Sequence, residues 1–400
     1  MALAQDVSRF KGRAVRFVIL LGVVSLLSDL TYEGARSING PFLALLGANA
    51  AVVATVAGLG EFIGYALRLV SGYVTEVTRR YWAVTIIGYA VNLLAVPLLA
   101  LAGRWEIAVA LMLAERLGKA IRTPARDAML AQASFTIGRG WGFGLHEALD
   151  QIGALAGPLV VAMVLALQGR GGYPMAYALL LIPAVLALSA LGVGWWLYPQ
   201  PQKLEVQRLT PEPAGLPRRF WLYLVAVALI AAGFADYPLI AFHFLKTGVL
   251  TDTWIPVIYA IAMGSDAIAA LILGAAFDRF GLRVMVVATL LAAFFAPLVF
   301  WGGFSSAVGG MIFWGIGLGA QESVMRAALA ELVPPARRAS AYGILQAGYG
   351  CCWFFGSLLM GLIYDWTLVG LVTFSVCCQL LAGFFFIFVS SKLIRVPLKL

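Results

Sequence analysis

The sequence predicts an all-helical membrane protein made of two similar halves, and three observations support this fold class. Hydrophobic residues make up 62% of the 400 residues and charged residues only 12%, which leaves too little polar surface for a water-soluble domain. Apolar stretches long enough to cross about 30 Å of hydrocarbon recur along the whole chain. A motif that begins at Gly274 also has a weaker copy that begins at Gly72, as expected of an internal duplication.

Each apolar stretch is predicted to cross the membrane as a helix, because a helix satisfies its own backbone hydrogen bonds in lipid. We expect twelve such spans, at about 17–38, 48–75, 82–103, 105–128, 139–168, 172–198, 220–245, 253–276, 283–303, 306–332, 338–364 and 367–391. The first span follows basic residues but continues past Asp29 without a small-residue cleavage site, so we interpret it as a retained helix.

The net charge of +9 is explained by the side of the membrane on which the basic residues lie. Lysines and arginines precede the first span and then occur on alternate connections, whereas the opposite connections hold only Arg104, Arg170 and Lys246. The positive-inside rule then places both the N- and C-termini in the cytoplasm. The apolar spans lead us to expect a multi-pass protein of the cell (inner or plasma) membrane. Because no basic patch is interleaved with exposed aromatic residues, we expect no nucleic-acid partner.

The connection 199–219 resembles a linker, since it holds Pro199, Pro201, Pro211, Pro213 and Pro217 among charged and polar residues. Proline-rich polar sequence neither crosses a bilayer nor forms a packed core. We therefore expect three parts, namely an N-terminal six-helix bundle (1–198), a cytoplasmic linker loop (199–219) and a C-terminal six-helix bundle (220–400).

Metal sites, disulfides and common catalytic motifs need residue spacings that this sequence does not show. Cys351, Cys352, Cys377 and Cys378 form adjacent pairs inside predicted spans, where neighbouring side chains on a helix diverge. The sequence contains no Walker-type phosphate loop for ATP hydrolysis. We therefore predict that the protein is not an enzyme and that it uses neither a metal nor another cofactor.

The repeated motif lies directly after the second and the eighth predicted span. Its second copy reads Gly-Ala-Ala-Phe-Asp-Arg-Phe-Gly-Leu-Arg, and its first copy reads Gly-Tyr-Val-Thr-Glu-Val-Thr-Arg-Arg. Together with twelve spans and a central cytoplasmic loop, the Gly-x-x-x-Asp-Arg-x-Gly-x-Arg pattern resembles the loop motif of the major facilitator superfamily (MFS). The residues of the motif are Gly72, Glu76 and Arg80 in the first copy and Gly274, Asp278, Arg279, Gly281 and Arg283 in the second.

The resemblance implies two pseudo-symmetric bundles of six helices and a gating role for the repeated motif. A carboxylate at the end of one helix can accept hydrogen bonds from the free N–H groups at the start of a neighbouring helix. By resemblance, Asp278 would hold the start of the eleventh span near Ser340, and Glu76 the start of the fifth near Gly140, when the cytoplasmic side is closed. The alternative is that these charges only solvate helix ends and anchor the topology.

A second motif, in the predicted fifth span, bears on the direction of transport. Gly153, Gly157 and Pro158 resemble the glycine and proline signature of antiporters in the same superfamily, which implies export. Two glycines one turn apart let helices approach closely, and a proline frees a backbone carbonyl and bends the helix. Val160 and Val161 occupy the stretch where the signature has further glycines, so uptake stays open as an alternative.

Charged residues inside the predicted spans are candidates for function, because each costs roughly 2.5–3.5 kcal/mol at a helix centre unless it is paired or hydrated. Spacings of three and four residues place them along helix faces. The resemblance implies that spans one, four, seven and ten line a central cavity. The candidates for substrate binding are Tyr32, Arg36, Arg116, Lys119, Arg122, Glu147, Asp150 and Glu322, and those for proton coupling are Asp29, Glu33 and Asp236.

Counting residues from the cytoplasmic end of each span predicts two contacts between these side chains. Asp29 and Arg116 come to a similar depth and are expected to face each other, as are Arg122 and Glu147. The alternative is a set of buried ion pairs that only hold the helices together. His146, beside two carboxylates, is open to two roles, a packing residue or a proton relay.

These observations predict a secondary active transporter that moves a small organic solute by alternating access. They favour proton-coupled efflux, by antiport, of a drug-like or anionic metabolite. The alternative is an uptake symporter or facilitator for an organic anion, which the basic residues of the fourth span support. A receptor or scaffold without transport explains the intramembrane charges least well. The expected partners are the solute, protons and the lipid bilayer, and we expect a monomer.

Overall fold

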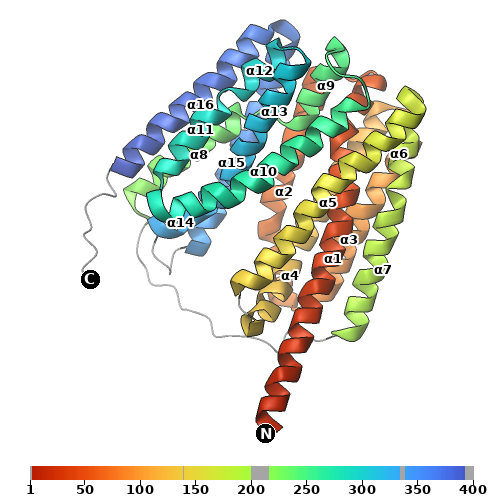
Figure 1. Ribbon diagram of the computed structural model, residues 1–400, viewed down its shortest axis with the longest axis vertical. Coiled ribbons are helices and arrows are strands. Elements are labelled where there is room, and N and C mark those ends of the chain that lie inside the picture. Colours follow the sequence, from red (N-terminus) through yellow and green to blue (C-terminus); the bar gives the residue numbers. More distant parts are fainter. Residues whose placement is uncertain (1, 138, 200–215, 334–337, 392–400) are drawn as a thin grey trace. The chain divides into compact units, whose positions relative to one another are not determined.

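The computed structural model describes residues 2–137, 139–199, 216–333 and 338–391, with side chains for most of them. All regular elements within these residues are helical (Figure 1). They divide between two compact units, the first made of residues 1–42 and 63–208 and the second of residues 43–62 and 209–400. Two of the boundaries fall inside helices, one between Phe42 and Leu43 and the other between Phe62 and Ile63. The predicted three-part division at 198 and 219 stays a prediction.

The helices of the two units follow one another along the chain. The first unit contains α1 (Ala2–Leu45), α2 (Ala50–Thr78), α3 (Tyr81–Leu98), α4 (Trp105–Ile137), α5 (Arg139–Gln168), α6 (Tyr173–Leu179) and α7 (Leu181–Leu197). The second contains α8 (Arg218–Gly233), α9 (Tyr237–Thr247), α10 (Trp254–Phe280), α11 (Arg283–Ala292), α12 (Phe295–Trp301), α13 (Phe304–Gly319), α14 (Met325–Leu332), α15 (Arg338–Trp366) and α16 (Leu368–Ser391). The last residues of α1 and the first part of α2 belong to the second unit. A π-helical turn, η4 (Ala320–Val324), joins α13 to α14.

Three of the predicted spans are broken near their middle, and a proline explains each break. The span 172–198 is split into α6 and α7, 220–245 into α8 and α9, and 283–303 into α11 and α12. Pro183, Pro238 and Pro297 lie in the first turn of the second helix of each pair. In each case the residue four positions earlier is the last or capping residue of the preceding helix. Because proline lacks an N–H group and its ring clashes with that carbonyl, the first helix ends and a second begins.

Nine helical stretches among the described residues are long and apolar enough to cross a membrane. One of them, Leu145–Leu197, contains α5, α6 and α7 and corresponds to two predicted spans. The predicted spans 105–128 and 306–332 are not among the nine, and the first of these lies in α4, which carries seven charged residues from Glu106 to Asp127. The helical character of the spans is confirmed, whereas their number, twelve, stays a prediction.

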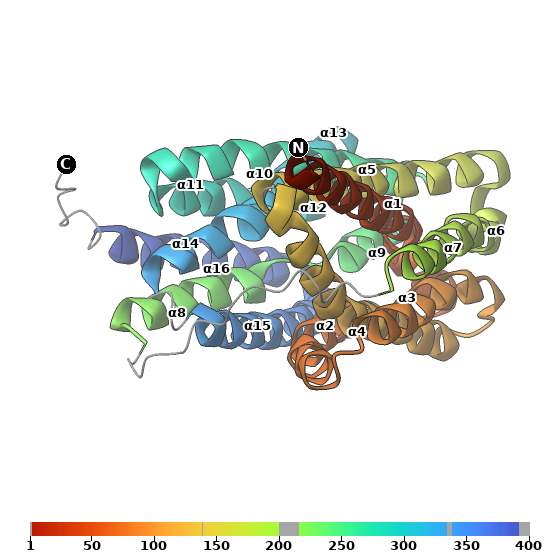
Figure 2. The ribbon, with the colours of Figure 1, turned by 90° about the horizontal axis from the view of Figure 1, so that it is seen from below.

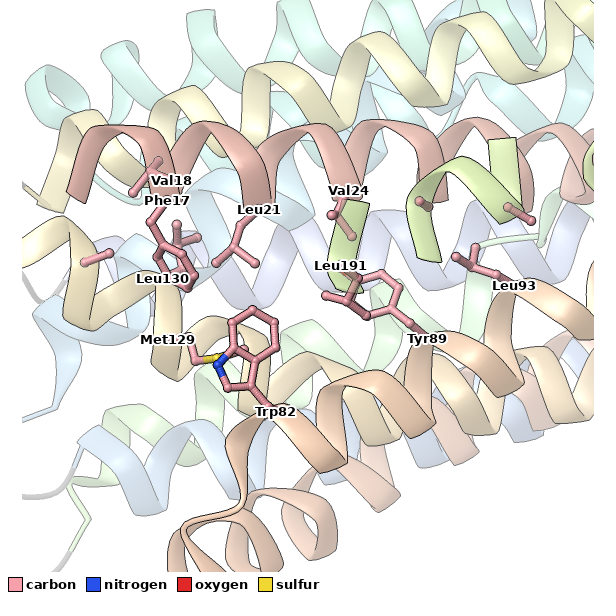
Figure 3. Packing of buried hydrophobic residues seen from close by; sticks show 13 residues of the cluster. Phe17, Val18, Leu21, Val24, Trp82, Tyr89, Leu93, Met129, Leu130 and Leu191 are labelled. Carbon is pink, nitrogen blue, oxygen red and sulfur yellow. The ribbon is translucent and has the colours of Figure 1, made fainter. Parts of the chain in front are cut away.

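The first unit packs around an apolar cluster where α1, α3, α4 and α7 meet (Figure 3). Phe17 of α1 lies edge-on to Trp82 of α3, with ring centroids 6.1 Å apart. The buried indole N–H of Trp82 donates to the carbonyl oxygen of Tyr198 at 2.8 Å, so this polar group keeps a partner away from water. The cluster holds α3 against α1 and α4, the helices that carry Asp29, Glu33, Lys119 and Arg122.

The second unit has an interior rich in aromatic rings. Its helix α8 lies alongside α15 and α16 (Figure 2). The ring of Phe234, directly after α8, lies 5.1 Å from Phe295, 5.4 Å from Trp314 and 5.7 Å from Trp353, measured between ring centroids. Aromatic rings at these separations bury large apolar areas, and their contacts with one another involve no charged group.

Candidate functional site

Helix α1 places a row of polar side chains on one buried face of the first unit. Asp29, Tyr32 and Glu33 are 7%, 6% and 6% exposed. Tyr32 and Glu33 follow Asp29 by three and four residues, so both lie on its face of the helix. Arg36 continues the row, and its Nη1 lies 3.9 Å from Oε1 of Glu33. The row brings two carboxylates into the interior of the unit.

Helix α4 supplies cations to the same interior. Nζ of Lys119 lies 3.8 Å from the centre of the Tyr32 ring, and Cζ of Arg122 lies 4.2 Å from the centre of the Tyr89 ring of α3. Contacts of this kind stabilise a cation without neutralising it. Arg122 is 1% exposed, and its Nε and Nη1 have no hydrogen-bond partner within the described residues. The charges of both cations are therefore available to other groups in the interior.

Two glycines let α3 and α4 approach closely enough for these contacts. A β-carbon at Gly88 would lie 2.6 Å from the backbone nitrogen of Arg122, and one at Gly118 would collide with the backbone of Asn92. Asn92 also donates through Nδ2 to the carbonyl oxygen of Glu115 at 3.0 Å and to its Oε1 at 2.8 Å. The close backbone contact fixes where the charged residues of α4 lie.

Helix α5 packs against α1 through the antiporter-like motif. β-Carbons at Gly153 and Gly157 would collide with the carbonyl oxygens of Leu26 and Leu30, so the two helices touch backbone to backbone. The proline of the motif lies inside α5, which continues past it. Because Asp29 lies between Leu26 and Leu30, the motif forms its contact at the level of this acid.

Asp150 of α5 joins the same group of charges. A hydrogen bond links it to Ser25 of α1, and Ser25 accepts from Nη1 of Arg126 at 3.1 Å. On its own helix, Nε2 of His146 lies 3.6 Å from Oδ2 of Asp150. The spacing of four residues turns both side chains towards the same face of α5. Helices α1, α4 and α5 therefore bring their ionisable groups together inside one unit.

The charges that act most strongly on Asp29 are those of Asp150, Lys119 and Arg122. Depth counting predicts Arg116 opposite Asp29 instead. In the structure Nε of Arg116 lies 3.3 Å from the carboxylate that precedes it in the sequence. The cations that reach Asp29 thus come one and two turns further along α4 than the sequence predicts.

The expected pair between Arg122 and Glu147 does not form among the described side chains. Arg122 lies on the Tyr89 ring, whereas Glu147 is exposed and its Oε1 lies 3.4 Å from Nε2 of Gln151. Successive residues of a helix are rotated by about 100°. Because His146 faces inward, the next residue along α5 faces outward. A depth count carries no information on rotation about the helix axis, so it could not predict this difference.

The second unit places Asp236 at the break between α8 and α9, where it caps the start of α9. Its Oδ1 accepts from the backbone N–H of Tyr237 at 2.8 Å, and its Oδ2 accepts from the indole N–H of Trp353 at 3.3 Å. The indole of Trp314 donates to the carbonyl oxygen of Ala235 at 2.9 Å. Where the helix is broken, backbone N–H and C=O groups lose their partners within the helix. The side chains of Asp236 and Trp314 provide hydrogen-bond partners for two of them, which a segment that crosses a membrane requires.

Glu322 lies in the π-helical turn η4, and its side chain is exposed. The preceding residue, Gln321, is buried instead, and its Oε1 accepts from the hydroxyl of Tyr349 at 2.7 Å. A π-helical turn shifts the register of the following residues, and such turns recur at functional sites. Regular helical spacing could not have predicted that Gln321, rather than Glu322, faces inward.

The two copies of the loop motif end their helices in the same way. Arg79 donates its backbone N–H to Thr75, and Gly281 donates to Phe277, both at 2.8 Å. Both residues also have a positive φ, 54° for Arg79 and 58° for Gly281. This left-handed region suits glycine and is strained for arginine. The first copy therefore shares the positive φ of the second but has a less suitable residue at that position.

The latch contacts of the motif stay a prediction. Glu76 and Asp278 are exposed. The helix starts expected opposite them, near Gly140 and Ser340, lie among residues whose side chains are outside the described part.

The arrangement in the first unit is suited to changes of charge. When a carboxylate in a poorly hydrated interior takes up a proton, the balance with neighbouring cations changes strongly. Within the described residues, no three His, Cys, Asp or Glu side chains come together as a metal site requires. Buried ionisable groups of both signs, as in this cluster, can bind protons or charged groups.

The comparisons with known proteins agree with this architecture. A family described as the Major Facilitator Superfamily matches residues 222–399. An uncharacterized protein of Mycobacterium tuberculosis is 43% identical over 378 residues, which cover 92% of this chain and 91% of that protein. The chain belongs to the major facilitator superfamily. The predicted family and the all-helical MFS fold are confirmed.

More distant members of the superfamily share the fold. An uncharacterized MFS-type transporter of Methanocaldococcus jannaschii is 34% identical over 153 residues, which cover 38% of each protein. The crystal structure of the nucleoside transporter NupG matches with a TM-score of 0.68 at 16% identity, covering 94% of this chain and 98% of that one. As an MFS protein, the chain is a multi-span protein of the cell membrane that transports a solute.

The sequence did not predict the contacts that Ser25, Tyr89 and Trp353 make in these clusters. Ser25 lies one turn before Asp29 on the same face of α1, and this spacing is a signal that could have found it. Tyr89 and Trp353 look like ordinary apolar residues of a span. Their contacts with Arg122 and Asp236 depend on how neighbouring helices are placed, which one sequence does not reveal.

Proposed function

We propose that the protein is a proton-coupled exporter of a small organic solute, in which Asp29 carries the proton. The observation that supports this most is the position of Asp29, a buried carboxylate on α1 within electrostatic reach of Lys119, Arg122 and Asp150. An acid in such a place can bind and release a proton as its surroundings change during alternating access. Glu33, in the same row, is the second candidate for coupling.

Export is supported by the glycines of α5. Gly153 and Gly157 contact α1 on either side of Asp29, so the motif that resembles the antiporter signature also forms the wall beside the proposed coupling acid. A backbone contact without intervening side chains lets a small shift of one helix change the surroundings of its neighbour. Proton binding at Asp29 and movement of α5 are therefore coupled in our proposal.

The charge of the substrate and the direction of proton movement are linked by this geometry. A cationic group would compete with the proton for the carboxylates of Asp29 and Asp150, and competition produces antiport. An anionic group would instead bind Lys119 and Arg122 most strongly when Asp29 is protonated, and joint binding produces symport. For an exporter we therefore favour a drug-like solute with a cationic group.

A second candidate is a symporter or facilitator for an organic anion. The observation that favours it is Arg122, which is buried and has two nitrogen atoms, Nε and Nη1, without a hydrogen-bond partner in the described residues. Carboxylates and phosphates are the groups that guanidinium binds best. In this case Lys119, over the ring of Tyr32, would be the second cation of the binding site.

One assay separates these candidates. Purified protein is placed in liposomes with an internal pH dye, and cationic drugs, zwitterions and organic anions are added outside in turn. The exporter predicts that a cationic compound makes the interior more alkaline as protons leave in exchange. Symport predicts that an organic anion makes it more acidic. Labelled solute that equilibrates without proton movement would contradict proton coupling and indicate a facilitator.

We further propose that the loop motif stabilises one closed state, through Glu76 and Asp278. Removing either charge in Glu76→Gln or Asp278→Asn should change the rate of solute exchange in the liposomes several-fold, because the closed and open states would no longer be balanced. Glu106→Gln, an exposed acid outside the motif, serves as the control. Equal exchange rates in all three variants would favour the topology-anchoring role.

A further inference from the structure

We infer that Asp29 and Asp150 share a single proton, so that the coupling group is a pair of carboxylates across the contact between α1 and α5. The inference deepens the proposed function and rests on proton coupling in the first unit. It also gives Asp150, which the sequence suggested as a substrate ligand, a different role.

The packing of α1 against α5 places the two acids on facing sides of one helix contact, about one turn apart. A β-carbon at Gly153 would lie 3.1 Å from Cβ of Asp29, so this part of α5 directly faces Asp29. Asp150 lies one turn before Gly153 and therefore on the same face of α5. Its hydrogen bond with Ser25, one turn before Asp29 on α1, is a second contact that fixes its place. Asp150 also exerts a stronger electrostatic effect on Asp29 than any other charged group does.

The charged groups that surround the pair come from three helices. Lys119, Arg122 and Arg126 face it from α4, Glu33 from α1 and His146 from α5 itself.

The cations among these groups also have other partners, although Arg126 acts on Asp150 more strongly than the other charges do. Arg126 forms an ion pair at 2.8 Å with Asp127, its neighbour in the sequence. Lys119 and Arg122 lie against the rings of Tyr32 and Tyr89. Two carboxylates close together in a poorly hydrated interior repel each other, and one shared proton removes most of that repulsion.

The oxygens of Asp150 suit this role. Oδ2 lies 3.6 Å from Nε2 of His146, whereas Oδ1 is buried and has no hydrogen-bond partner within the described residues. Oδ1 is therefore the oxygen that can hold the shared proton or receive it from the carboxyl group of Asp29. Transfer within the pair moves one proton from one carboxyl oxygen to another and leaves the total charge unchanged. The pair then binds and releases one proton per transport cycle.

Infrared spectroscopy of the full-length protein in lipid tests the pair, because a protonated carboxyl group has a C=O stretch separate from that of a carboxylate. Spectra at neutral pH are compared for the wild type, Asp29→Asn, Asp150→Asn and the exposed-acid control Glu106→Gln. A shared proton predicts that both Asn variants lose the same part of the protonated-carboxyl band, since the acid that remains no longer has a like charge beside it. The control is expected to keep the whole band.

The conservative variant Asp150→Glu keeps a second carboxylate and should retain this part of the band, which separates loss of the pair from loss of folding. If Asp150→Asn keeps the signal that Asp29→Asn removes, Asp29 holds its proton alone and the inference is wrong. If neither variant changes the band, no proton lies between these acids and the inference is also wrong. Proton flux in the liposome assay is independent of the spectra, so a pair without flux would contradict the proposed function alone, and flux without a pair would contradict this inference alone.

Discussion

The two units fill their interiors in different ways although their sequences retain a common motif. In the first unit, ionisable groups of α1, α4 and α5 lie together, as Asp29, Lys119 and Asp150 show. In the second unit, neutral donors and rings dominate, as in the bond from the Trp314 indole to a backbone carbonyl. Asp236 and Asp266 are buried acids of this unit, and Asp236 caps a helix. This difference indicates that the first unit is the better candidate for binding and releasing protons. The second unit is the better candidate for a structure that changes little during transport.

Both units nevertheless use the same device to bring helices together. In the first, Gly153 of α5 meets the backbone of α1 at Leu26, and in the second, Gly356 of α15 meets the backbone of α8 at Ala232. The helix ends of the repeated motif also match, at Arg79 and Gly281. The duplicated features are therefore those of the backbone, while the side chains inside have diverged.

The largest effect on stability is expected where α1 and α5 touch. Gly153→Ala places a methyl group against the carbonyl oxygen of Leu26, and overpacking of this kind costs about 3 kcal/mol. The matched control is Gly192→Ala, since no atom lies within 4 Å of that β-carbon and alanine favours a helix. Thermal unfolding in detergent should show a much lower midpoint for Gly153→Ala and an unchanged or higher one for the control. Equal midpoints would mean that α1 and α5 are not in backbone contact.

A smaller loss of stability is expected in the second unit from Trp353→Phe. The substitution keeps an aromatic ring but removes the indole N–H that donates to Oδ2 of Asp236, a bond to a charged group worth about 2 kcal/mol. Trp195→Phe, at a side chain that is 55% exposed, is the control. We expect Trp353→Phe to lower the unfolding midpoint while proton flux persists. A folded variant that loses proton flux would transfer the coupling role to the second unit.

The smallest effect is expected at the ends of the repeated motif. Arg79→Gly relieves a positive φ and should raise stability by about 1 kcal/mol, whereas Gly281→Ala places a β-carbon on a residue with a positive φ and should lower it. The two changes are mirror experiments on the two copies. Shifts of the unfolding midpoint in the same direction would show that the copies differ in backbone shape.

The sequence predicted the fold class and the family well, because apolar stretches and the loop motif are local patterns. It also predicted the buried face of α1 with Asp29 and Glu33, since spacing along a single helix fixes which side chains share a face. The partners across helices were harder. Depth counting chose Arg116 and Glu147, whereas the rotation of α4 and α5 brings Lys119 to Tyr32 and turns Glu147 outward.

The breaks within predicted spans were readable in principle. Pro238 and Pro297 each lie in the first turn after a break, so a proline in mid-span could have been taken as a helix boundary. The π-helical turn that turns Gln321 inward has no comparable signal. Its position follows from packing between helices and not from the residues of the turn alone.

Proton movement in liposomes, compared between Asp29→Asn and Asp236→Asn, tests the central claim most directly. Both substitutions replace a buried carboxylate by an amide of the same shape, one in each unit. The compound that gives the largest signal with the wild type is used throughout. We predict that Asp236→Asn, where it folds, still moves protons and that Asp29→Asn does not. Proton movement that survives in Asp29→Asn at the wild-type level would contradict the assignment of coupling to the first unit.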